Sequence, residues 1–167
     1  RHTIARDFYY DVDIKNAHPT ILLWYCDNHN IPCESIRYYI DNRDSCLNEL
    51  MNTFSKTKDE IKETLLSIIN GGNPKFDCSD APRWLIDFYS QIQTIHTQIT
   101  DLNPKLLKEA KKKYGDNYFN LKGSCINNIF CDYENTILQI MYQTCLDNNI
   151  SVGVFVFDGM MINRENI

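Results

Sequence analysis

Two aspartates, one near each end of the sequence, are the side chains best suited to carry chemistry. Asp13 closes the segment Tyr9–Asp13, whose alternating residues favour a β-strand. Asp158 precedes Gly159, and an Asp-Gly pair between apolar runs is a strong hairpin-turn signal. If that hairpin pairs beside the first strand, the two carboxylates meet. Carboxylates in close contact repel each other unless they are protonated or share cations.

A pair of divalent metal ions roughly 3.5–4 Å apart would relieve that repulsion and is the usual device for in-line phosphoryl transfer. Mg²⁺, with Mn²⁺ as a substitute, suits the site because magnesium sites combine one or two carboxylates with substrate phosphates. A backbone group of Ile14 or Val12 is a candidate third ligand. Asp11 lies on the same strand face as Asp13 and would support it without binding the metal directly. Asn16 would support the site in the same way and can also cap the following helix.

A predicted helix over Lys56–Ile69 carries candidate phosphate ligands. Lys58 and Lys62 lie four residues apart and so share one helix face. The helix ends at Asn70-Gly71-Gly72, where little side-chain bulk would obstruct a stacked base. Each feature alone has a plainer explanation, as a hairpin turn, a solvated helix face or a helix cap. Their joint arrangement favours nucleotide chemistry.

The elements that must position these residues follow a simple order. One strand is followed by a series of predicted helices, and the chain closes with a hairpin made of Ile150–Phe157 and Met160–Ile162. The last long helix is predicted over Ser124–Asn148, after a loop over Gly115–Gly123. Sequential strand–helix–strand units are absent, so we expect an α+β fold in which a small antiparallel sheet joins the first strand to the hairpin and packs with several helices.

Composition limits the class of protein. The 167 residues suffice for one domain, and no apolar run or signal sequence suggests a membrane or secretion. The seven cysteines are odd in number and form no close pair, which favours reduced thiols and an intracellular location, in the cytoplasm or a viral replication compartment. The net charge of −5 argues against binding nucleic acid by overall charge, although Lys105–Lys113 is locally basic.

The order and spacing of these residues resemble the core of family A DNA polymerases, and most closely their divergent viral branch in virophages and related mobile elements. Asp13 falls at the metal position of the first motif, and His18 stands where that family has a glutamate under the sugar. Lys62 is followed by Asn70-Gly71 at the spacing of the family's Lys and Tyr-Gly, and Lys58 takes the place of a phosphate-binding arginine. Phe157-Asp158-Gly159 matches the third motif, His-Asp-Glu, only at the aspartate.

The resemblance implies one polymerase catalytic core over 1–167, with a palm over 1–29 and 81–167 and fingers over about 30–80. It implies a template-directed DNA polymerase that transfers a nucleotide from a dNTP to a primer 3′-hydroxyl in viral replication. Asp13 and Asp158 would be the catalytic residues and hold two Mg²⁺ ions. Primer-template DNA, dNTP and a helicase or primase of the same complex would be the partners, with no role for a membrane.

Two departures leave alternatives open. Asn70 replaces the stacking tyrosine of the resembled family, and Gly159 replaces a third carboxylate. A metal-dependent nuclease could use the same two aspartates. The chain could also be a non-catalytic palm remnant, or a helical module through which a replication protein binds a helicase or primase.

Overall fold

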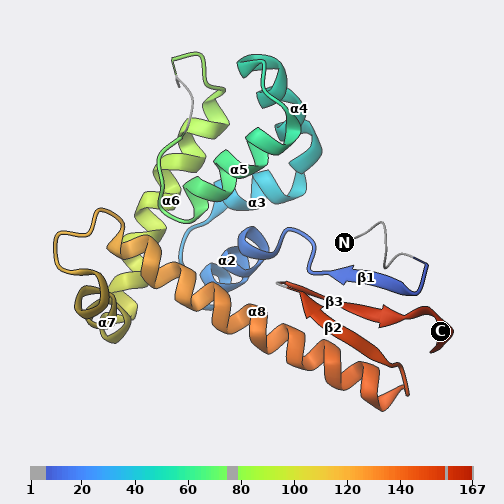
Figure 1. The fold of residues 1–167 in the computed structure, drawn as a ribbon. Coiled ribbons are helices and arrows are strands. Elements are labelled where there is room, and N and C mark those ends of the chain that lie inside the picture. Colours follow the sequence, from blue (N-terminus) through green and yellow to red (C-terminus); the bar gives the residue numbers. More distant parts are fainter. Residues whose placement is uncertain (1–6, 75–78, 157, 167) are drawn as a thin grey trace. The chain divides into compact units, whose positions relative to one another are not determined.

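The computed structural model describes residues 7–74, 79–156 and 158–166 and has an α+β fold (Figure 1). Within these residues, three strands form one antiparallel sheet and seven α-helices lie between the first strand and the second. The strands are β1 (Tyr9–Asp13), β2 (Val152–Val156) and β3 (Gly159–Asn163). The helices are α2 (Ala17–Asn28), α3 (Glu34–Asp41), α4 (Arg43–Phe54), α5 (Lys58–Ile69), α6 (Arg83–Leu102), α7 (Pro104–Tyr114) and α8 (Leu121–Asp147), and a 3-10 turn, η1, follows over Arg164–Asn166.

The sheet joins the two ends of the chain, as predicted. Its strand order is β1-β3-β2, so the C-terminal hairpin pairs with the first strand through β3. The register sets Val12 opposite Met160 and Asp13 opposite Gly159. Met160 is buried, and Tyr142 of α8 packs edge-on against Phe155 of β2 with ring centroids 5.3 Å apart. Helix α8 therefore supplies apolar cover for the sheet.

The chain divides into two compact units. The sheet unit contains the described residues up to Ala17 and those from Cys131 onward, and the helical unit contains His18–Phe130. The helical unit has its own core, in which Ile61, Leu65 and Ile68 of α5 and Phe88 and Ile92 of α6 are at most 1% exposed. Burial of whole apolar side chains on two helices provides most of the stability of such a layer.

Two helix starts differ from the sequence prediction, those of α5 and α8. Helix α5 begins at Lys58 rather than Lys56, because Thr57 and Glu60 form a reciprocal capping box. Helix α8 begins at Leu121 rather than Ser124, since the Asn120 side chain accepts a hydrogen bond from the Gly123 amide. Helix α2 begins at Ala17, directly after Asn16, whose φ of 57° lies in the left-handed region that asparagine tolerates. Capping side chains thus decided where α5 and α8 begin.

Candidate functional site

The structure brings the segments of Asp13 and Asp158 together in the sheet unit. The Ile14 amide donates to the main-chain oxygen of Asp158 at 2.9 Å, and Asp13 lies opposite Gly159 in the β1–β3 ladder. A Cβ atom on Gly159 would overlap an Asp13 carboxylate oxygen and the Val12 carbonyl oxygen. Glycine at this position is therefore what lets the Asp13 carboxylate lie against the turn that carries Asp158.

The donor set of this pair suits a hard divalent cation. Among the described residues, no group of three or more His, Cys, Asp or Glu side chains could hold a metal ion. A cation at Asp13 and Asp158 would take its remaining ligands from main-chain oxygens, water or a phosphate, as Mg²⁺ commonly does. The ligand roles of Asp13, Asp158 and Ile14, the supporting roles of Asp11 and Asn16, and the number of ions stay predictions. Phe157, which precedes Asp158 in the third motif, lies outside the described residues.

The predicted phosphate ligands belong to the helical unit and form ion pairs there. The Lys58 ammonium lies 3.6 Å from Asp44, and the Lys62 ammonium lies 3.2 Å from Asp59. Both pairs are solvent-exposed, so each contributes little and would yield readily to a phosphate. The His18 ring packs against Phe130 with centroids 4.6 Å apart. The roles of Lys58, Lys62 and His18 as nucleotide ligands stay predictions.

Asn70 and Gly71 form a tight helix end. The Gly72 amide donates to the Ser67 carbonyl at 2.8 Å and the Gly71 amide to the Ile68 carbonyl at 2.9 Å, which is the Schellman pattern. Gly71 has a φ of 82°, a conformation that favours glycine. The sequence prediction that these glycines end the helix is confirmed.

The end of α5 is bound to the start of α8. The Asn120 side-chain amide donates to the Asn70 carbonyl at 2.9 Å, and the same side chain caps α8. A Cβ on Gly123 would overlap the Asn70 carbonyl oxygen. His96 of α6 donates its Nε2 proton to the Ile69 carbonyl at 2.9 Å. One close glycine contact and two hydrogen bonds therefore hold the end of α5 in place.

A polar cavity of about 240 Å³, here called the amide pocket, opens at this junction. Its walls carry mostly neutral hydrogen-bonding groups and one aromatic ring: Asn70, Tyr114, Asn120, Gly123, Ser124, Asn127 and Asn128. The Asn70 Oδ1 atom is buried and has no hydrogen-bond partner within the described part of the chain. A buried acceptor without a donor is costly, so this oxygen favours a ligand or a water that donates to it.

A basic and aromatic stretch leads into the amide pocket. Helix α7 carries lysines at 105, 108, 111, 112 and 113 and ends at Tyr114, which lines the pocket. Tyr114 stacks on Tyr118 with centroids 4.9 Å apart, Tyr118 contacts Phe119 at the same separation, and Phe119 is 88% exposed. We call residues 105–119 the basic–aromatic segment. Its exposed rings are unusual because large apolar side chains are normally buried.

Sequence reasoning missed this segment as a site. It noted the lysines of Lys105–Lys113 but not Tyr114, Tyr118 and Phe119, which follow them directly. Aromatic residues next to a lysine run were the available signal, since single-stranded nucleic-acid sites combine these residue types. The amide pocket had no such signal, because its walls come from segments about fifty residues apart in the chain.

Comparison of the sequence and structure with known proteins finds one similar viral protein. No family model and no solved structure matches the chain. A protein of Sputnik virophage named "Putative helicase V13" is 30% identical over 162 residues, which cover 93% of this chain and 21% of the relative. The chain thus spans about a fifth of that protein's length. In addition, no helix within the described residues is long and apolar enough to cross a membrane.

This comparison corrects the identification made from motif spacing. The resemblance to family A DNA polymerases, the assignment as a DNA polymerase and the nucleotidyl transfer that follows from it are wrong, because the matching relative carries a helicase name. The viral setting expected from the sequence agrees with that relative. Motifs of one or two residues each had too little specificity to identify a family.

Proposed function

We propose that this chain is a single-stranded nucleic-acid-binding domain of a helicase-related viral protein. The observation that carries the proposal is the basic–aromatic segment beside the amide pocket. Lysine side chains on α7 are suited to phosphates, and exposed rings at Tyr114 and Phe119 are suited to stacking on bases. The similarity to a protein named "Putative helicase V13" supports this assignment, since helicases act on nucleic acid.

The amide pocket would hold one unpaired base. Its volume of about 240 Å³ is below the roughly 300–1,000 Å³ of sites for drug-sized ligands, which suits a single ring system. Asparagine side chains both donate and accept, so Asn127 and Asn128 can pair with the edge of a base. A base donor could also satisfy the buried Asn70 oxygen. Asn70 keeps the base-binding role predicted for it.

The lysines of helix α7 give the basic–aromatic segment a positive charge although the whole chain is acidic. The net charge of the chain is −5, yet helix α7 contains five lysines and one acid, Glu109. Lys105, Lys108 and Lys112 follow a helical spacing of three and four residues and are all exposed, so they share one face. Because dissolved salt screens charges beyond about 10 Å at an ionic strength of about 0.1 M, this face governs the approach of a phosphate backbone.

The thiols support an intracellular setting for this function. The six cysteines that the structure describes are free, and Cys131 is the exposed one among them. Burial raises the pKa of Cys26 to about 12 and that of Cys46 to about 11, so these thiols stay protonated and act as small apolar residues. A helicase or primase module of the same protein is the proposed partner.

Binding of a fluorescein-labelled dT20 oligonucleotide, followed by fluorescence anisotropy, tests the proposal. Tyr114→Ala and Phe119→Ala should each weaken binding about tenfold, because loss of one stacked base contact costs about 1–3 kcal/mol. Replacing Lys105, Lys108 and Lys112 together with Gln should lower the slope of log K against log salt by about 2 units. An abasic oligonucleotide of the same length should bind more weakly than dT20.

Tyr142→Ala removes a similarly exposed tyrosine from the sheet unit and serves as the matched control. It should leave affinity for dT20 unchanged. Equal affinity of wild type, Tyr114→Ala and Phe119→Ala, or equal weakening by Tyr142→Ala, would refute a site at the basic–aromatic segment.

A second function is favoured by the Asp13–Asp158 arrangement. We propose that this pair binds Mg²⁺, with phosphate or water completing the coordination. Support comes from the Gly159 contact, which sets a carboxylate oxygen of Asp13 directly against the turn of Asp158.

Mn²⁺ binding, measured by electron paramagnetic resonance of the free ion, tests the metal proposal. Asp13→Asn and Asp158→Asn should each weaken binding at least about tenfold, since each removes one of two anionic ligands. Asp132→Asn, a change of equal charge at an exposed position of α8, should have no effect. If all three variants bind Mn²⁺ like the wild type, the aspartates are not metal ligands.

A further inference from the structure

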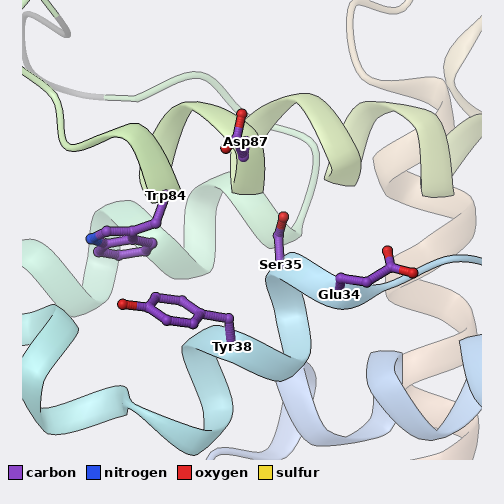
Figure 2. A pocket seen from close by; sticks show the side chains of 5 residues that line it. All are labelled: Glu34, Ser35, Tyr38, Trp84 and Asp87. Carbon is purple, nitrogen blue, oxygen red and sulfur yellow. The ribbon is translucent and has the colours of Figure 1, made fainter.

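A second cavity, of about 220 Å³, lies between helices α3 and α6 in the helical unit. Glu34, Ser35 and Tyr38 of α3 and Trp84 and Asp87 of α6 line it. Figure 2 shows the Trp84 indole over the Tyr38 ring at one end, with Ser35, Asp87 and Glu34 further along. We call this cavity the aromatic–acidic pocket. It is separate from the residues that line the amide pocket.

The two rings leave a face open to a ligand. Their centroids are 6.2 Å apart and their planes are inclined by 45°, so the rings are not closely stacked. Tyr38 is 48% exposed and Trp84 is half-buried. The indole Nε1 proton is bound by Glu49 at 2.7 Å, which fixes the orientation of the ring.

Gln91 preorganises the polar end of the pocket. Its side-chain oxygen accepts from the Ser35 amide at 2.8 Å, and its side-chain nitrogen donates to Glu34 at 2.8 Å. This double contact binds the first turn of α3 to α6. A pocket held this way loses little freedom when a ligand enters, which favours binding.

The two charged side chains that line the pocket, Glu34 and Asp87, are both acids. The nearby Arg37 is already paired with Asp27 at 2.6 Å. A hydrogen bond from its own backbone amide, and then one from Gln91, lower the pKa of Glu34. Asp87 forms an ion pair with Arg83 at 3.1 Å, which is exposed and therefore weak.

We propose that the aromatic–acidic pocket receives a lysine or arginine side chain from a basic segment of a partner protein. The aliphatic stem of such a side chain would lie along Tyr38 and Trp84, and its cation would face their rings and the Glu34 carboxylate. The cavity volume suits one side chain. A nucleic-acid strand suits the two rings but not the surrounding acids, because its phosphates would be repelled. This surface and the basic–aromatic segment would then engage different partners.

The indole N–H resonance of Trp84 in ¹⁵N NMR spectra of the whole chain reports on this pocket. The chain has two tryptophans, and the Trp24→Phe variant assigns the remaining indole signal to Trp84. The probe is a tetra-arginine peptide with blocked termini, compared with a tetra-glutamine peptide of the same length. Tetra-arginine should shift the Trp84 signal saturably, and tetra-glutamine should not.

Tyr38→Leu and Glu34→Gln should each weaken tetra-arginine binding about two- to fivefold, the usual effect of one exposed cation–π or carboxylate contact. Asp101→Asn removes a carboxylate from the other end of α6 and should have no effect. A peptide affinity reduced equally by Asp101→Asn would reveal only general charge attraction and overturn the proposal. So would an unmoved Trp84 signal, or a larger shift with dT20 than with tetra-arginine.

Discussion

Acidification from pH 6.5 to about 4 is expected to remove about 3 kcal/mol of stability through one side chain, His96. This residue of α6 is 1% exposed and donates to the Ile69 carbonyl at 2.9 Å. Burial lowers the pKa of His96 to about 4 from an ordinary value of 6.5, against the opposing effect of the Ile69 hydrogen bond. The His96 ring is therefore neutral in the folded helical unit at neutral pH.

The loss of stability on acidification follows from the number of protons that the folded and unfolded chains bind. Below pH 6.5 the unfolded chain protonates this histidine, whereas the folded chain does so only near pH 4. The unfolded state thus binds more protons in this window, so stability falls as the pH falls. The contribution is fully present above pH 6.5 and is lost progressively as the pH approaches 4.

Urea unfolding of the wild type and of His96→Gln between pH 7 and 4.5 measures this effect. The amide of Gln can still donate to the Ile69 carbonyl but does not titrate, so the wild type should lose more stability than the variant on acidification. His29→Gln, at an exposed position, is the matched control and should follow the wild type. Parallel curves for wild type and His96→Gln would mean that His96 does not titrate differently on folding.

Gly123→Ala is expected to destabilise the helical unit by about 2 kcal/mol, although alanine is the better helix former. Gly123 lies in the first turn of α8, where helix propensity alone predicts a gain of about 0.5–1 kcal/mol. The added methyl group would overlap the Asn70 carbonyl oxygen and both polar atoms of the Asn120 side-chain amide. Steric overlap with backbone is relieved only by moving α5 away from α8.

Thermal and urea unfolding measure whether Gly123→Ala lowers or raises the free energy of unfolding. Asn135→Ala, at an exposed position of the same helix, is the control for propensity and should be neutral or slightly stabilising. The double variant Gly123→Ala with Asn120→Ala should remain destabilised, because the overlap with the Asn70 carbonyl persists. Stabilisation by Gly123→Ala would show that α5 and α8 do not approach this closely.

Both predictions concern one junction that also forms the amide pocket. His96 holds the Ile69 carbonyl, and Asn120 holds the Asn70 carbonyl. Gly123→Ala should therefore weaken dT20 binding as well as stability. Weaker binding under conditions where the variant is fully folded would connect the pocket directly to the proposed function.

The sequence by itself determined the local structure. Periodic apolar residues predicted the helices, and the residues from Asn70 to Gly72 predicted where α5 ends, because helix ends depend on groups only a few residues apart. The α+β class, with a small antiparallel sheet, followed from the same patterns. Helix starts were placed less well, because Thr57 and Asn120 cap through side-chain hydrogen bonds that several nearby residues could equally have made.

Only the tertiary structure decided which distant residues meet. The β1–β3 register joins Asp13 to Gly159, and the close approach of Gly123 to Asn70 creates the amide pocket. Such contacts depend on how whole helices and strands pack, and a single sequence does not encode them in any short spacing. The motif spacing that suggested a polymerase had the same weakness, since it counted positions along the chain without the contacts that give a site its chemistry.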